Sequence, residues 1–265
     1  MSALMEAHAV TVRFGGILAV DRVDLAVQTG EVLSIIGPNG AGKTTLLNVL
    51  SGIQRPYQGS LAFGGNRVTG ASSVTLARAG LARTFQTIRL FAGLSVLDHV
   101  LAGQHAHLHA GLLDALLRTP RLLREEDQAR ARARAILDRM GLSGAAEAVA
   151  ITLSYGDQRR VELARCLALD PRLLLLDEPA AGMNAVETAA LADVIRSIRA
   201  GGCTVVLIEH DMRLVMAISD RVVVLDRGQV LAEGTPPAIQ NNPAVIAAYL
   251  GTAAHVPAEL PAEAR

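Results

Sequence analysis

The segment Gly37-Pro38-Asn39-Gly40-Ala41-Gly42-Lys43-Thr44-Thr45 decides the fold of this chain. It matches the pattern G-x-x-x-x-G-K-[ST], in which backbone N–H groups and a lysine bind phosphate groups. Lys43 is the only lysine among the 25 lysines and arginines of the chain. Its ammonium is a compact charge on a flexible stem, so it can reach between phosphates where a planar guanidinium is less suited. The sequence therefore predicts a nucleotide-binding site.

The residues on either side of this loop predict a strand before it and a helix after it. Val32-Leu33-Ser34-Ile35-Ile36 is an apolar run typical of a strand that is covered on both faces. The segment from Lys43 to Leu50 predicts a helix that ends near Gly52. In such an arrangement the helix N-terminus binds phosphate, Lys43 reaches the β and γ phosphates, and the Thr44 hydroxyl binds Mg²⁺. The alternative is a glycine-rich turn with an incidental lysine.

Further segments predict an α/β fold with a mostly parallel sheet. The apolar runs Leu173 to Leu176 and Thr204 to Ile208 each end in acidic or histidine residues. Strands that alternate with helices form parallel sheets, and ligands bind at the carboxyl ends of such strands. The alternating segments His8 to Phe14 and Val23 to Val27 predict antiparallel strands near the N-terminus. The segment from Ser95 to Gly141 predicts an inserted group of helices.

Composition narrows the class of protein. The 25 basic and 25 acidic residues give no net charge, so no nucleic-acid partner is expected. Cys166 and Cys203 lack metal-ligand spacing, which predicts two reduced, packed thiols. The first thirty residues have no basic stretch followed by an apolar run, and no continuous apolar run is long enough to span a membrane, so a soluble cytosolic protein is expected. His105, His107 and His109 have no carboxylate or cysteine beside them, and only the first and third share a helix face. We therefore expect no metal site there.

Two adjacent carboxylates, Asp177 and Glu178, follow the apolar run that begins at Leu173. At the end of a buried strand beside a phosphate loop, one carboxylate can hold Mg²⁺ while the other polarises an attacking water. We predict that Asp177 is the metal ligand and Glu178 the general base. In the absence of the phosphate loop, a solvated acidic pair would be the better interpretation.

A set of short motifs accompanies these carboxylates in a characteristic order. Leu153 to Arg160 reads LSYGDQRR, about twenty residues before the acidic pair, while Gln86 precedes it and Ala181 to Asn184 and His210 follow it. These segments resemble the signature loop, Q-loop glutamine, D-loop and switch histidine of ATP-binding cassette (ABC) ATPases. Phe14 is similar in position to the aromatic residue that stacks on adenine in that family.

Longer segments resemble the ATP-binding subunit of branched-chain amino acid importers. The resemblance covers roughly residues 5 to 251, and the segments that carry it are RTFQ (83–86), RLF (89–91), DEPAAG (177–182), EHDM (209–212), NNP (241–243) and YLG (249–251). It implies a P-loop NTPase (RecA-like) core with an antiparallel β subdomain, at about 5–86 and 160–251, and a helical subdomain inserted at about 87–159. The implied single domain spans 1–251, and a flexible tail is expected at 252–265.

The resemblance assigns a role to each motif. In that family two cassettes close head to tail, and each ATP lies between the phosphate loop of one and the signature loop of the other. Ser154 and Gly156 would therefore contact the partner's ATP, at the positive end of the helix that follows. The residues implied to bind ATP, hold Mg²⁺ or take part in hydrolysis are Phe14, Gly37 to Thr45, Gln86, Asp177, Glu178 and His210, with Gln86, Lys43, Glu178 and His210 acting in catalysis.

The same resemblance implies the partners and the location. These are a second, different cassette, two transmembrane permease subunits and an extracytoplasmic solute-binding protein, with the chain peripheral on the inner face of the cell membrane. Branched-chain amino acids are the expected solute, and other amino acids, amides or urea remain open.

Three of these roles have a purely structural alternative. Gln86 could be solvated, His210 could cap a helix, and Phe14 could be part of the core. A non-transport ABC ATPase acting on DNA or ribosomes is the main functional alternative, although such proteins carry tandem cassettes or long coiled coils that this chain lacks. A kinase built on the same loop would leave the signature loop and His210 unexplained.

Two residues depart from the general cassette pattern. Asp157 stands where the signature usually has glutamine, and Asn184 stands where the D-loop usually ends in aspartate. A carboxylate close to phosphate would oppose its charge. We therefore expect Asp157 to point away from the nucleotide and to stabilise the first turn of its own helix. Asn184 is expected to tune the dimer contact without ending hydrolysis.

Overall fold

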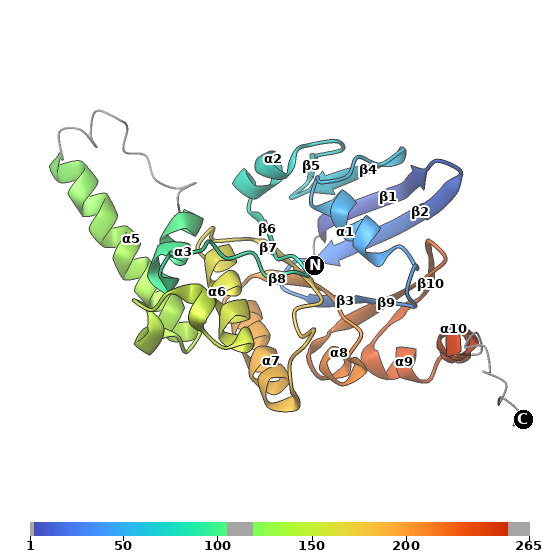
Figure 1. Ribbon diagram of the computed structural model, residues 1–265. Helices are drawn as coiled ribbons and strands as arrows, with labels where there is room; N and C mark the ends of the chain where they lie inside the picture. The colour runs from blue at the N-terminus through green and yellow to red at the C-terminus, as the bar shows by residue number, and fades with distance from the viewer. Residues whose placement is uncertain (1–2, 105–118, 254–265) are drawn as a thin grey trace, which may run out of the picture.

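The phosphate loop follows an inner strand of a sheet that is parallel except at one edge. The computed structural model describes residues 3–104 and 119–253 (Figure 1). Within these residues, six strands stand in the order β10-β9-β3-β8-β7-β6, and only β10 runs antiparallel to its neighbour. The strands are β3 (Val32–Ile36), β6 (Leu81–Arg83), β7 (Leu173–Asp177), β8 (Thr204–Ile208), β9 (Arg221–Asp226) and β10 (Gln229–Gly234).

The register of this sheet brings the predicted functional segments to one edge. Every residue of β3, β7 and β8 is buried, as expected of strands covered on both faces. Ile208 pairs with Ile35 on one side and with Asp177 on the other. The carboxyl ends of the three strands are therefore level, and the loops that leave them lie side by side.

A second sheet covers one face of the first, with a helix between them. Within the described residues its strand order is β2-β1-β4-β5, all antiparallel. These strands are β1 (Ala3–Phe14), β2 (Ile17–Gln28), β4 (Gln58–Phe63) and β5 (Asn66–Arg67). Helix α1 (Lys43–Leu50) lies between the two sheets, and its Leu46 and Leu50 join one apolar cluster with residues of both. The helix that carries Lys43 is therefore fixed on two sides.

Helices cover the other face of the parallel sheet. Leu174 and Leu176 of β7 pack in one cluster with Val161 and Leu163 of α6. Figure 1 shows α3, α5 and α6 grouped together, with α5 projecting away from the sheets. The helices on this side are α3 (Val96–Gly103), α5 (Pro120–Arg139), α6 (Tyr155–Leu167) and α7 (Ala185–Ala200). The remaining elements are α2 (Ser73–Arg78), η2 (Ser143–Ala145), η3 (Ala150–Thr152), α8 (Met212–Ile218), α9 (Pro236–Gln240) and α10 (Pro243–Ala253).

The predicted α/β class is confirmed, and the structure adds detail at the predicted boundaries. Helix α6 spans the predicted subdomain boundary at 159/160. It packs on α3 and α5 of the helical group and also on the sheet, so it belongs to both parts. Helix α10 continues to Ala253, two residues into the predicted tail. The residues 254–265 and the histidines His105, His107 and His109 lie outside the described residues.

Two further expectations concern the thiols and the membrane. Cys166 and Cys203 are free and buried, and burial raises the pKa of each thiol to about 12. Both are therefore poor nucleophiles, because the thiolate is the reactive form. In the part of the chain that the structure describes, no helix combines the length and the apolar character needed to cross a membrane.

Candidate active site

The phosphate loop depends on glycine at two positions. Gly37 and Gly42 have φ angles of 149° and 98°. A Cβ at Gly37 would lie 2.1 Å from the carbonyl oxygen of Leu225, and one at Gly42 would lie 2.3 Å from that of Ala19. Gly42 is also the N-cap of α1 and supplies no side chain to cap it. The N–H groups of the first turn are thus left for a ligand, as an anion site at a helix N-terminus requires.

The Lys43 side chain lies across this loop. Its Nζ donates to the carbonyl oxygens of Gly37 at 2.7 Å and Pro38 at 2.9 Å. Burial lowers the pKa of the Lys43 ammonium, while the charges of Glu178 and Asp177 act in the opposite direction. The Lys43 ammonium is therefore close enough to the two carboxylates for their charges to affect its pKa. By contrast, Asn39 and Gly40 at the tip of the loop are exposed.

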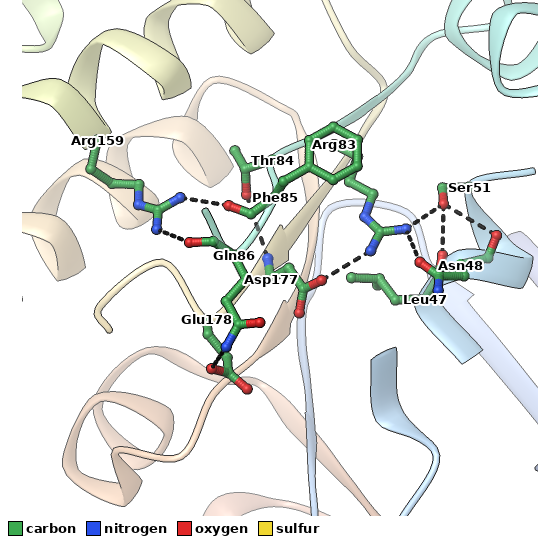
Figure 2. A network of polar contacts seen from close by, with 10 residues as sticks. All are labelled: Leu47, Asn48, Ser51, Arg83, Thr84, Phe85, Gln86, Arg159, Asp177 and Glu178. Atoms are coloured by element: carbon green, nitrogen blue, oxygen red, sulfur yellow. Dashed lines mark hydrogen bonds and ion pairs between the residues drawn. The ribbon is translucent and has the colours of Figure 1, made fainter. Parts of the chain in front are cut away.

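Asp177 is fixed by an arginine whose role the sequence did not reveal. Arg83 Nη2 lies 2.9 Å from Asp177 Oδ2, and both side chains are almost fully buried. Its Nη1 donates to Asn48 Oδ1 at 2.8 Å and to Ser51 Oγ at 2.7 Å (Figure 2). Arg83 thereby connects the ends of β6 and β7 to α1. The signal in the sequence was the place of Arg83 in the segment RTFQ (83–86), which carried no role for the arginine itself.

The oxygens around Asp177 fit a magnesium ion. Arg83 donates to Oδ2, and no hydrogen bond to Oδ1 is found among the described residues. Mg²⁺ prefers hard oxygen ligands and is held in nucleotide sites by one or two carboxylates together with phosphate oxygens. Asp177 can offer one carboxylate oxygen, and Thr44, which is exposed at the start of α1, can offer a hydroxyl. The donor set is therefore suitable.

Glu178 lies between two other predicted residues. Its Oε1 is 2.8 Å from His210 Nε2, and its Oε2 accepts a hydrogen bond from Gln86 Nε2 at 2.8 Å. Its backbone φ is 47°, a left-handed conformation that is unusual for a non-glycine residue and is often found at functional sites. Gln86 is thus not merely solvated. Nor does His210 cap α8, because Asp211 does so.

A buried glutamate supports this arrangement from behind. Glu209 Oε1 accepts from the backbone N–H of Ala180 at 2.7 Å, and Oε2 accepts from that of His210 at 3.0 Å. Burial raises the pKa of the Glu209 carboxyl, while these backbone donors favour its charged form. Glu209 therefore connects the segment after Glu178 to the segment that carries His210. Sequence reasoning had given it no role.

An arginine of α6 holds the backbone next to Gln86. Arg159 Nη1 donates to the Phe85 carbonyl oxygen at 2.8 Å, and Nη2 donates to that of Gln86 at 2.8 Å (Figure 2). Glu162 pairs with Arg159 at 2.7 Å, and both side chains are completely buried. This contact was also missed from the sequence. Its signal was an Arg and a Glu three residues apart in a predicted helix.

The signature loop begins α6. Ser154 is the N-cap residue and accepts from the Asp157 backbone N–H at 3.2 Å. The Asp157 carboxylate in turn accepts from Ser154 Oγ at 2.9 Å and lies 3.3 Å from Arg160 Nη1. Asp157 therefore contacts the first turn of its own helix, as expected, but its carboxylate lies on the Ser154 hydroxyl and not away from the group predicted to contact ATP. Gly156 is buried, whereas Ser154 is exposed at the surface.

Phe14 and Asn184 complete the placement of the predicted residues. Phe14 ends β1 and is 52% exposed, which excludes the core alternative. Asn184 is the N-cap of α7 and forms a capping box with Glu187. The amide thus performs a local task that an aspartate could also perform. Ser154, Gly156 and Phe14 do not join the cluster of Gln86, Glu178 and His210 within this chain.

Comparison with known proteins identifies the family. The family model described as ABC transporter matches residues 20–181, and the model described as Branched-chain amino acid ATP-binding cassette transporter matches residues 229–255. The chain belongs to the ABC transporter family. The cassette is 47% identical over 251 residues to the high-affinity branched-chain amino acid transport ATP-binding proteins LivG of Escherichia coli and BraF of Pseudomonas aeruginosa. The LivG match covers 94% of this chain and 98% of the relative.

Solved structures agree with this assignment. An ATP-binding cassette of an ABC transporter in its ADP conformation has a TM-score of 0.83 at 30% identity, covering 95% of this chain and 100% of that one. A nucleotide-free cassette has a TM-score of 0.81 at 29% identity, covering 94% and 99%. The predicted family, P-loop fold and ATPase activity of the cassette are confirmed. The roles of its individual residues remain predictions.

Proposed function

We propose that this chain is the ATP-hydrolysing subunit of an importer of branched-chain amino acids. The observation that carries ATP hydrolysis is the position of Glu178, whose two carboxylate oxygens each have one hydrogen-bond partner, His210 or Gln86, at the sheet edge where the phosphate loop begins. A carboxylate oxygen has two lone pairs. Each oxygen therefore keeps a lone pair with which to accept a proton from water.

In the proposed mechanism, catalysis is mostly electrostatic. The N-terminus of α1 and Lys43 would stabilise the phosphate oxygens, and Glu178 would orient the attacking water and take its proton. His210 would contact the γ-phosphate through Nε2, exchanging its hydrogen bond with Glu178 Oε1 for one to the nucleotide. Mg²⁺ held by Thr44, Gln86 and Asp177 would supply neutralisation of the phosphate charge. Arg83 would keep the Asp177 carboxylate in one orientation by holding Oδ2.

A second cassette would complete the site. Ser154 begins α6 in the helical group, apart from α1 in Figure 1, and its exposed hydroxyl would contact a nucleotide held by another molecule once it releases the Asp157 carboxylate, to which it donates in this structure. We propose a different cassette as the partner, two permease subunits that receive the motion of the dimer, and a solute-binding protein on the opposite side of the membrane. The chain would then lie on the inner face of the membrane.

The solute follows from the relatives and from the C-terminal segment. LivG and BraF are named for branched-chain amino acid transport, and the family model for such transporters matches residues 229–255, which include α9 and α10. The names of these relatives and of the family model favour a role in transport over action on DNA or ribosomes.

We expect the chain, its partner cassette and the permease pair encoded beside it to drive leucine uptake into proteoliposomes when ATP and Mg²⁺ are supplied on the cassette side. The solute-binding protein is supplied on the other side, and unlabelled valine and isoleucine should compete. A matched control replaces Glu178 by Gln in the same assembly. If the assembly transported an unrelated solute but not leucine, the proposed substrate would be wrong, while the proposed ATPase role would stand.

A shared site also predicts how ATP hydrolysis depends on concentration. The rate per molecule of the isolated chain should rise with protein concentration, and rise again when the partner cassette is added, because Ser154 and Gly156 act only across an interface. Steady-state phosphate release over a hundredfold dilution series measures this. A rate per molecule that stays constant throughout, with no response to the partner, would contradict the shared site.

A further inference from the structure

The pair Arg159 and Glu162 is a buried charge cluster that the proposed mechanism does not use. Their side chains are fully buried, and Nη1 of Arg159 lies 2.7 Å from Oε2 of Glu162. Burial raises the pKa of the Glu162 carboxyl, and the neighbouring arginine opposes that effect. Burying two charges is expensive, and an apolar pair of the same size often stabilises a fold equally well. Stability alone therefore does not explain why a charged pair is buried here.

The guanidinium has a specific target. Its two terminal nitrogens donate to the carbonyl oxygens of two successive residues, Phe85 and Gln86. These residues follow the end of β6 at Arg83 and have left the sheet. Among the described residues, no other donor reaches either carbonyl. Arg159 thus supplies the hydrogen bonds that fix this part of the backbone, with the planar fork that suits two adjacent acceptors.

The fixed backbone carries the side chain that touches Glu178. The amide of Gln86 donates to Glu178 Oε2 at 2.8 Å, although Gln86 itself is exposed (Figure 2). An exposed glutamine has many rotamers, so its amide stays on Glu178 only if its backbone is held. We infer that Arg159 is a positioning residue for ATP hydrolysis: it places Gln86, and through Gln86 the carboxylate of Glu178.

The position of Arg159 in α6 extends this role. The same helix begins at the signature residue Ser154, five residues earlier in the chain. One rigid helix therefore carries both the group offered to the partner's nucleotide and the group that fixes Gln86 in its own site. This inference rests on the proposed function of Gln86 and Ser154. It adds that movement of α6 is transmitted to Gln86 by two hydrogen bonds.

A double-mutant cycle with Gln86→Ala separates this role from simple stabilisation. Arg159→Lys keeps the charge beside Glu162, but one ammonium cannot reproduce the fork across two carbonyls. We expect it to lower kcat, measured with the partner cassette, about tenfold with less than about a twofold change in the KM for ATP. In the Gln86→Ala background, Arg159→Lys should have almost no further effect on kcat, because residues that act through one contact are not additive.

Arg221→Lys is the matched control. Arg221 also pairs with a glutamate, Glu31, at 2.7 Å and contacts the carbonyl oxygen of Ala26, but at the far end of β9. It should lower the melting temperature without changing kcat in either background. Should Arg159→Lys fail to fold, Arg159→Met/Glu162→Leu removes both charges together and is expected to show the same loss of kcat.

Three results would overturn the inference. Multiplicative effects of Arg159→Lys and Gln86→Ala would show that Arg159 acts elsewhere, as would full kcat in Arg159→Met/Glu162→Leu. Full kcat in Gln86→Ala alone would remove Gln86 from the proposed mechanism, and the inference with it. Because Gln86→Ala is measured by itself, failure of the proposed function and failure of the positioning role are distinguishable.

Discussion

Glu178→Gln is expected to lower the turnover number for ATP by about 10² to 10⁴-fold, the range typical of a lost general base. The amide has the shape of the carboxylate and can still accept from Gln86 Nε2, which lies 2.8 Å from Glu178 Oε2. It cannot take a proton from water. ATP binding should therefore persist, and the cassette dimer should accumulate with ATP bound.

Single-turnover hydrolysis and nucleotide-dependent dimerisation with the partner cassette measure the two halves of this prediction. Glu147→Gln is a suitable control, since Glu147 is exposed and, among the described residues, its side chain makes only a long ion pair with Arg134 at 3.8 Å. It should hydrolyse ATP at the normal rate. Near-normal hydrolysis by Glu178→Gln would assign the base to another residue.

Lys43→Ala is expected to weaken ATP binding itself. A charge-assisted contact to phosphate contributes about 1.5–3 kcal/mol, which corresponds to roughly a 10- to 100-fold loss of affinity. The variant also loses the hydrogen bonds from Nζ to Gly37 and Pro38, so the loop is less well ordered before the nucleotide arrives. Both effects act in the same direction.

Calorimetric titration with a non-hydrolysable ATP analogue measures that affinity. Lys43→Met separates the ammonium group from the apolar stem, because it retains an unbranched apolar stem but neither the charge nor the donors of Nζ. It should bind as weakly as Lys43→Ala. Wild-type affinity in either variant would show that the α1 N-terminus alone binds the phosphates.

Sequence patterns predicted the fold, and the family resemblance predicted three residues that the structure brings into contact. The apolar runs that became β3, β7 and β8 are fully buried, so their pattern is dictated by burial on both faces and can be read locally. Gln86, Glu178 and His210 were predicted as one set, and the structure brings their side chains together. Each of these residues follows the carboxyl end of a strand, and the parallel sheet brings those ends to the same edge.

The residues that sequence reasoning missed act across the fold. Arg83 is separated from Asp177 by 94 residues, and Arg159 is separated from Phe85 by 74. Glu209 reaches back to Ala180 across 29 residues. An exposed and a buried charge look the same in a sequence, and these three are identified only when packing removes them from water. Their common task is to hold segments in place rather than to contact the nucleotide.

The lone lysine has a practical consequence for proteolysis. A lysine-specific endoprotease has one target in the whole chain, the peptide bond between Lys43 and Thr44. Lys43 is 6% exposed and begins a helix enclosed by two sheets, so the protease can reach this bond only after the loop and α1 have opened. Because cleavage of a protected bond follows the population of the open form, a single cut reports every opening, local or global, that exposes the nucleotide site. Local opening elsewhere that leaves this site folded produces no cut.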